Sequence, residues 1–274
     1  MTVHDRPARR LGRHVVLLGT VLIMIFPLLW ALTTSFKPAN NIYSTNPLPL
    51  PATLGNYRFT FAEFPIARLL LNTFVMASGA TLLQLVVSVP AAYALVRLRT
   101  RGQGLVLVAL TVALVVPAQA LIIPHFLLAT RLEWRNTYLG LVVPQLATSA
   151  LAVLLLREHV RKLPPTLASA AILDGATAWE VLRFIVLPLL RPSLAAVGII
   201  VFINTWNEYL WPSLIAPGRE NTTIQVGLAL FGNQEGQDFG PLLAAAMIST
   251  LPIVAVYMFA SRRIADAFLQ SGLR

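Results

Sequence analysis

Six long stretches, each with at most one charged residue, constrain the fold of this chain more than any other feature. A helix that crosses a bilayer needs about 20 apolar residues, and each stretch can supply one. The stretches show no strand-like alternation, and in lipid only helices or closed barrels satisfy the backbone. The pattern therefore predicts an all-α polytopic membrane protein. Its six transmembrane helices are expected near residues 14–34, 70–96, 104–129, 138–157, 193–215 and 240–261.

The amount and placement of charge exclude two broad classes of protein. Only 12% of the 274 residues are charged, whereas a soluble domain carries about a quarter. So few charges cannot coat a soluble globule of this size, which excludes a water-soluble enzyme. The net charge of +10 lies in short clusters between apolar stretches, so we expect no nucleic-acid partner. The absence of cysteine also excludes a thiol nucleophile.

The basic residues indicate how the chain is oriented in the membrane. With the N-terminus inside, six of the 21 lysines and arginines would lie outside, namely Lys37, Arg58, Arg68, Arg131, Arg135 and Arg219. The other fifteen would lie inside, and such an excess marks the cytoplasmic side. We therefore expect both termini in the cytoplasm, with tails at residues 1–13 and 262–274. The first stretch is too long for a signal peptide and lacks a cleavage site, which favours a retained anchor.

The inner loop, residues 159–192, is the most structured connection. Pro165, followed by small and apolar residues, predicts the first turn of a short helix. Gly175 fits the end of that helix, where a left-handed residue turns the chain. Residues 178–187 are predicted to form a second short helix that ends at Pro188. This helix–turn–helix suits docking into a groove of a partner protein, and an interfacial helix without a partner is the alternative.

Glu208 is the only acidic residue inside a predicted span, and ionisable groups in membranes are functional candidates by default. Asn204, Asn207 and Trp211 are predicted to share one helix face with it, because their spacing follows the helical period. Amides, a carboxylate and an indole suit a sugar, since they offer hydrogen bonds and a stacking plane. In the alternative, Glu208 lies near the outer boundary and anchors its helix there.

Further polar residues lie in the third and fourth predicted spans. Gln119 belongs to the third, and Gln145 and Ser149 are four residues apart in the fourth, so these two are expected to face one cavity. Such residues more often hold helices together than bind solute, and both roles stay open. His125 is expected to be packed.

Two rival functions find little support in the sequence. The only lysines, Lys37 and Lys162, do not follow the glycine spacing of an ATP-binding loop, so the chain is not expected to be an enzyme. An intramembrane enzyme would also need convergent catalytic groups, and none is present. A secondary transporter or channel would more often use several buried charges or broken helices in repeated halves, and the chain shows no repeat.

The inner loop resembles the EAA loop of ABC-importer permeases, which has the pattern E-A-A-x3-G-x9-I-x-L-P. Six residues match it at the required offsets: Ala170, Ala171, Gly175, Ile185, Leu187 and Pro188. Asp174, Gly175 and Ala176 look like the D-G-A common in carbohydrate-uptake members. Ser169 stands where the family has Glu, so the carboxylate for an ion pair with the ATPase is missing here.

Residues 206–212 are similar to the W-N-[DE]-[FY]-L-W-P segment of MalG-type permease subunits. The resemblance implies a type I ABC importer permease fold over residues 14–261. It also implies import of a sugar or sugar-like solute, with a lean towards glycerol-phosphate and amino-sugar types. In that family ATP and Mg²⁺ bind to a partner ATPase, so no cofactor is expected in this chain.

The resemblance further implies the partners and the compartment. They are a MalF-like second permease, two cytoplasmic ATPases and an extracytoplasmic binding protein, in the inner membrane of a prokaryote. The EAA loop would contact the ATPase. The last outer loop, with Asn233, Gln234 and Glu235, resembles in position the loop that reaches into the docked binding protein, and a plain solvated loop is the alternative.

Overall fold

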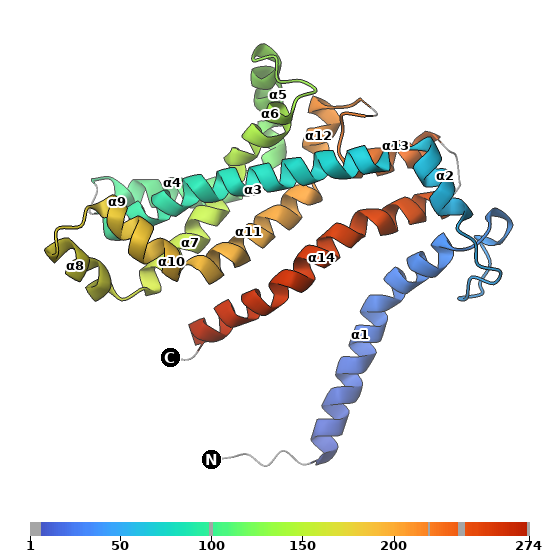
Figure 1. Cartoon of the computed structure of the whole chain (residues 1–274), viewed down its shortest axis with the longest axis horizontal. Helices are drawn as coiled ribbons and strands as arrows, with labels where there is room; N and C mark the ends of the chain where they lie inside the picture. The colour runs from blue at the N-terminus through green and yellow to red at the C-terminus, as the bar shows by residue number, and fades with distance from the viewer. Residues whose placement is uncertain (1–6, 99–100, 219, 235–238, 273–274) are drawn as a thin grey trace. The chain divides into compact units, whose positions relative to one another are not determined.

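The computed structural model describes residues 7–98, 101–218, 220–234 and 239–272. Most of these residues are helical and no strand occurs among them, which confirms the all-α prediction (Figure 1). The helices are α1 (Pro7–Ser35), η1 (Ala39–Asn41), α2 (Gly55–Glu63), α3 (Ile66–Arg97), α4 (Gln103–Val115), η2 (Ala118–Leu121), α5 (Ile122–Arg131), α6 (Tyr138–Val142), η3 (Val143–Thr148), α7 (Ala150–Lys162), α8 (Pro165–Leu173), α9 (Ala178–Glu180), η4 (Val181–Val186), α10 (Leu187–Leu189), α11 (Arg191–Trp206), α12 (Leu210–Ile215), α13 (Ile224–Gln234) and α14 (Phe239–Gly272).

Three segments of the described chain are single helices long and apolar enough to cross a membrane: Gly12–Ser35, Ile66–Arg97 and Phe239–Met258. They lie where the sequence predicted the first, second and last spans. Three further helix pairs meet the same criterion only when both members are taken together. Each pair is bent by more than 40°, so the described chain has up to six spans if each bent pair is one span.

The helices expected near residues 104–129, 138–157 and 193–215 are each interrupted. The first is bent by 97° between α4 and η2, where Pro117 ends the regular hydrogen bonding. The second is bent by 53° where the 3-10 helix η3 gives way to α7. The third ends at Trp206, and α12 begins only at Leu210. The Asn207 side chain donates to the Ile203 carbonyl at 2.9 Å and so caps the end of α11.

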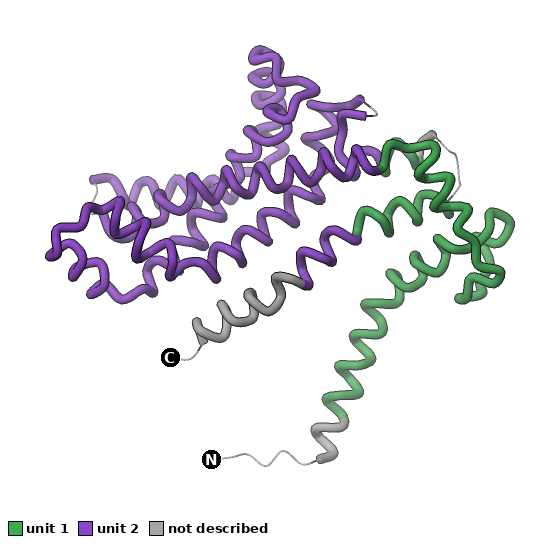
Figure 2. The backbone as a smooth tube through the Cα atoms, viewed as in Figure 1, with its two compact units in different colours: residues 1–66, 228–250 green, residues 67–227, 251–274 purple. Residues whose placement is uncertain are grey.

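The chain divides into two compact units (Figure 2). The smaller comprises Met1–Ile66 and Leu228–Thr250. In it the buried Asn56 amide donates to the carbonyls of Ser35 and Lys37, both at 2.8 Å. The buried Lys37 ammonium donates to the Ser44 carbonyl at 3.1 Å and lies 5.0 Å from the centre of the Trp30 ring. These contacts fold the connection after α1 against the end of that helix.

The larger unit comprises Ala67–Gly227 and Leu251–Arg274. Its main core joins the adjacent ends of α3, α7 and α11 to the inner loop (Figure 1). The buried members are Val89, Ala92, Tyr93, Ala152, Leu156, Val160, Ala168, Val181, Leu182, Val186, Leu190, Val197 and Val201. The inner loop is therefore packed onto the helix ends rather than free of them.

A separate cluster of buried polar contacts fastens the segment before α13 to α3. Asn72 donates to the Glu220 and Thr222 carbonyls, both at 2.9 Å, and accepts from the Tyr138 hydroxyl at 2.7 Å. The Thr73 hydroxyl accepts from the Ile224 N–H at 2.8 Å. These bonds satisfy backbone groups that would otherwise be buried without partners.

Candidate functional site

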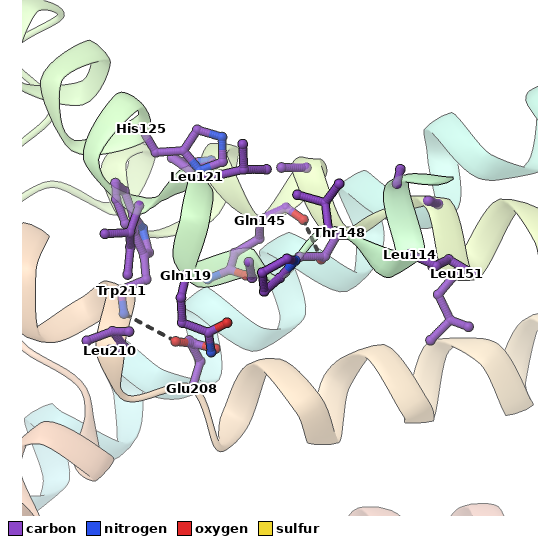
Figure 3. A pocket seen from close by; sticks show the side chains of 18 residues that line it. Leu114, Gln119, Leu121, His125, Gln145, Thr148, Leu151, Glu208, Leu210 and Trp211 are labelled. Atoms are coloured by element: carbon purple, nitrogen blue, oxygen red, sulfur yellow. Dashed lines mark hydrogen bonds between the residues drawn. The ribbon is translucent and has the colours of Figure 1, made fainter. Parts of the chain in front are cut away.

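A cavity of about 420 Å³ lies in the larger unit where the broken helices meet (Figure 3). Its lining includes residues 116–119 between α4 and α5, residues around the junction of η3 and α7, and Glu208 in the break after α11 with Leu210 and Trp211 at the start of α12. Non-helical backbone at membrane depth is tolerated where it borders a cavity or is buried in protein. The three breaks thus have a common structural setting, and the cavity is the first candidate site.

Glu208 borders this cavity from the break between α11 and α12. The side chain is half-buried, and its Oε1 accepts a hydrogen bond from the Trp211 N–H at 3.2 Å. The buried Trp211 indole in turn donates to the Gly140 carbonyl at 2.9 Å. The Glu208 carboxylate therefore holds the first turn of α12 and also borders the cavity. This geometry is compatible with both roles considered for Glu208, contact with a solute and anchoring of its helix.

Gly140 must be glycine for this arrangement to form. A Cβ atom there would collide with the Trp134 carbonyl oxygen and lie 3.1 Å from Cγ1 of Ile215. The missing side chain lets α6 pack closely against Trp134 and Ile215. In this position the Gly140 carbonyl accepts from the Trp211 indole and so fixes the Trp211 ring at the edge of the cavity.

Gln145 faces the cavity as predicted, but its neighbour there is Thr148 and not Ser149. The expected pairing assumed an α-helix, in which residues four apart share a face. The segment is instead a 3-10 helix, in which residues three apart are aligned. Thr148 donates to the Gln145 carbonyl at 2.8 Å, and the buried Gln84 amide donates to the same carbonyl at 2.8 Å.

The predicted single face of Asn204, Asn207, Glu208 and Trp211 is not formed, because α11 ends between its members. Asn204 and Glu208 line a smaller adjacent cavity of about 180 Å³. Glu208 and Trp211 line the larger one, with Gln119 from the break between α4 and α5. Asn207 lines neither cavity, since its amide caps α11 and its carbonyl oxygen accepts from Gln225 at 3.3 Å.

Four polar residues that line these cavities were not among the predicted site residues: His125, Thr148, Gln84 and the buried Thr205. His125, expected only to be packed, is half-buried and lines the larger cavity, with its ring edge-on to Trp211 at 6.2 Å between centroids. Thr148 was missed because its segment was assumed to be an α-helix and is a 3-10 helix. Gln84 lines the smaller cavity from α3. An amide inside an apolar span was the available signal for it.

The inner loop is the second candidate site, and its first helix confirms the prediction. Pro165 is the first residue of α8, and Gly175 follows the helix with φ +90°. The Ala176 N–H donates to the Ala171 carbonyl at 2.9 Å, which closes the turn as expected for a left-handed helix end.

Thr177 and Glu180 form a capping box at the start of the second helix. The Thr177 N–H donates to Glu180 Oε2 at 2.7 Å, and the Glu180 N–H donates to the Thr177 hydroxyl at 3.3 Å. Hydrogen bonds from the Thr177 backbone and side chain lower the pKa of the exposed Glu180 carboxyl. The capping box fixes the direction in which the chain leaves Gly175.

The second helix does not end at Pro188 as predicted. Helical structure continues to Leu189, because Val181–Val186 are wound as a π-helix and Pro188 then lies in the first turn of α10. A bend of 77° follows before α11 begins at Arg191. Prolines at 188 and 192 and the wider π turn account for this bend.

Most of the residues predicted to couple this loop to an ATPase lie on its exposed surface. Six of them are exposed, while Ala171 and Ile185 are half-buried. The exposed ones are Ser169, Ala170, Asp174, Gly175, Leu187 and Pro188. The Ser169 hydroxyl donates to the Pro165 carbonyl at 3.1 Å, within its own helix. Large apolar side chains lie exposed beside them, with Leu173 88% and Trp179 62% exposed.

The outer loop predicted over residues 217–239 contains a helix. Asn233 and Gln234 belong to the last turn of α13, whose earlier residues Ile224 and Phe231 are buried. Glu235 lies outside the described residues. Apolar burial outweighs the glycines and amides that led us to expect a loop.

Residues 84–268, more than half of the chain, match the family described as "Binding-protein-dependent transport system inner membrane component". The probable ABC transporter permease protein y4oR of Sinorhizobium fredii is 31% identical over 92% of this chain and 91% of its own length. The trehalose/maltose transport system permease protein MalG of Thermococcus litoralis is 30% identical over 96% of this chain and 98% of its own length.

A solved structure shares the fold of this chain. It is a crystal structure of a bacterial ABC transporter involved in the import of the acidic polysaccharide alginate. One chain of it superposes with a TM-score of 0.79, at 22% identity, over 96% of this chain and 99% of its own. With residues 84–268 matched, this chain belongs to the inner membrane component family of binding-protein-dependent transport systems.

Proposed function

We propose that this chain is one permease subunit of an ATP-driven, binding-protein-dependent importer of a sugar or sugar-like solute. The observation that carries the proposal is that the breaks between α4 and η2, between η3 and α7 and between α11 and α12 border one cavity in a member of this family. Relatives named for the uptake of diacetylchitobiose, arabinooligosaccharides and trehalose or maltose favour a sugar. The relative named for sn-glycerol-3-phosphate keeps a glycerol-phosphate type open.

In this proposal, residues 14–261 form the permease domain and the loop 159–192 docks on an ATPase. A MalF-like second permease completes the pathway, two ATPases bind ATP and Mg²⁺, and an extracytoplasmic binding protein delivers the solute. The excess of basic residues on the predicted inner side supports cytoplasmic termini. The long apolar helices contact lipid, and no nucleic acid takes part.

The packing of the inner loop gives a route for coupling. When the ATPases close on ATP, they would move the exposed face around Gly175. Val181, Leu182 and Val186 anchor the loop in the core shared with α3, α7 and α11, so a displacement is transmitted to these helices. α11 ends at the break that carries Glu208, one wall of the cavity. ATP then shifts the population between two states of the assembly, because the ATPase contacts differ between them.

An ATP-independent secondary transporter is the second candidate, and the broken helices favour it, because such transporters build their binding sites from discontinuous helices. An intramembrane enzyme has no such support.

ATP hydrolysis separates the two candidates. The chain is purified with its neighbouring subunits in lipid bilayers, and hydrolysis is measured with and without binding protein and a panel of sugars and glycerophosphodiesters. Stimulation by one loaded binding protein is the expected result. If no ATPase copurifies and no solute stimulates hydrolysis, the importer proposal fails and the ATP-independent role replaces it.

A further inference from the structure

The charges around the cavity point to a class of solute. Relatives of this chain are named both for neutral sugars, such as trehalose and maltose, and for an acidic solute, sn-glycerol-3-phosphate. Membership of the family therefore does not decide the charge of the transported molecule. The side chains that border the cavity do carry this information, because a solute must pass them with much of its water removed.

Among the described residues that line the two adjoining cavities, Glu208 is the only one with a carboxylate, and none is lysine or arginine. The other polar groups are neutral amides and hydroxyls together with the His125 imidazole. They are Gln84, Gln119, Gln145, Thr148, Asn204 and Thr205. One Glu208 oxygen accepts from the Trp211 N–H, which is a backbone group and adds no compensating positive charge.

The volume and the lining of the larger cavity suit a small carbohydrate. Its volume of about 420 Å³ lies within the range of about 300–1,000 Å³ that is usual for small-molecule sites. Apolar side chains such as Leu114, Leu121 and Leu151 line it together with the amides of Gln119 and Gln145. A sugar ring presents apolar faces and hydroxyl edges, so both kinds of surface find partners.

We propose that the Glu208 carboxylate selects neutral or amino-bearing sugars and disfavours sugars that carry carboxylate or phosphate. The inference rests on the proposed function and adds the class of substrate to it. A solute whose negative charge lies about 10 Å from Glu208, at an effective dielectric constant near 20, would bind roughly tenfold more weakly than its neutral counterpart. A protonated amine would gain by a similar factor.

The test uses the transporter assembled with its partner subunits in lipid nanodiscs. Dissociation constants are measured for three disaccharides of one size: maltose, the amine-bearing chitosan disaccharide and a mannuronate disaccharide. We expect the wild type to bind the mannuronate about tenfold more weakly than maltose. Glu208→Gln keeps an oxygen for the Trp211 N–H and should abolish this difference.

Two further variants keep the test decisive if Glu208→Gln assembles poorly. Gln119 is exposed to the cavity, and Gln119→Lys adds a positive charge that offsets the Glu208 carboxylate, so it should also remove most of the preference for maltose over the mannuronate. Glu133→Gln removes the same charge from an exposed position that does not line the cavity, and should change nothing. Equal binding of all three probes by the wild type, tighter binding of the mannuronate, or no binding of maltose and the amine overturns the inference.

ATP-driven uptake by the same assembly, measured in vesicles, separates this inference from the proposed function. A complex that transports but does not distinguish charge refutes the inference alone. A complex without ATP-driven uptake of any solute refutes the proposed function.

Discussion

Replacing Gly175 by valine tests whether the inner loop docks on an ATPase. Gly175 has φ +90°, a left-handed conformation that costs a residue with a side chain about 1–2 kcal/mol. A Cβ atom at this position would meet nothing within 4 Å, so the substitution causes no clash inside this chain. The valine side chain would instead project from the exposed face that we assign to the partner, and it should abolish transport.

Gly102 offers a matched control in the connection between α3 and α4. Its φ is +83°, and a Cβ atom there would also meet nothing within 4 Å. Gly102→Val should therefore lose the same 1–2 kcal/mol of stability. Gly102 belongs to another loop on the same predicted side of the membrane, so transport should persist.

Three measurements on both variants decide the matter: insertion into the membrane, the melting temperature of the assembled complex, and ATP hydrolysis stimulated by loaded binding protein. We expect equal insertion and equal melting temperatures, with stimulated hydrolysis lost only in Gly175→Val. Normal uptake by Gly175→Val would refute docking through this loop. An equal loss of hydrolysis in both variants would refute it as well, because the strain alone would then explain the defect.

Four other substitutions test the described hydrogen bonds and packing, each through the melting temperature of the complex. Gly140→Ala should destabilise by about 2–4 kcal/mol through the clash and the loss of the Trp211 hydrogen bond, and an unchanged melting temperature would contradict the described packing. Asn72→Leu loses three hydrogen bonds and should cost about 2–4 kcal/mol, whereas Tyr138→Phe loses one of them and should cost about 1 kcal/mol; equal effects would speak against the shared network. Thr177→Ala removes the capping box and should cost about 1 kcal/mol while leaving solute binding unchanged, so altered binding would count against separate sites.

Local chemistry made the inner loop predictable. Pro165 fits the first turn of a helix because its missing N–H would be unpaired there anyway. Gly175 adopts the left-handed conformation that residues with a side chain avoid. The preferences of proline and glycine depend only on the neighbouring backbone, so both residues could be interpreted without knowledge of the tertiary structure.

The winding of the membrane segments was not predictable in the same way. Ser149 was expected beside Gln145, and Asn207 beside Glu208, because both inferences assumed continuous α-helices. An isolated apolar segment gains most from unbroken helical hydrogen bonding. Pro117 was a visible signal for one break, but proline in a membrane helix also occurs at a mere kink. The outcome depends on which groups nearby can pair with the freed backbone.

The sequence by itself therefore determined that the chain is helical, which segments are apolar enough for the membrane, and where the inner loop turns. These properties follow from hydropathy and from proline and glycine stereochemistry, which act over a few residues. Only the tertiary structure decided that three breaks border one cavity, where Thr148 and His125 join Glu208, and that Gln84 joins Glu208 in lining the smaller cavity beside it. The physical reason is that a broken helix is stable only where other segments supply partners for its backbone, and those partners lie far away in the sequence.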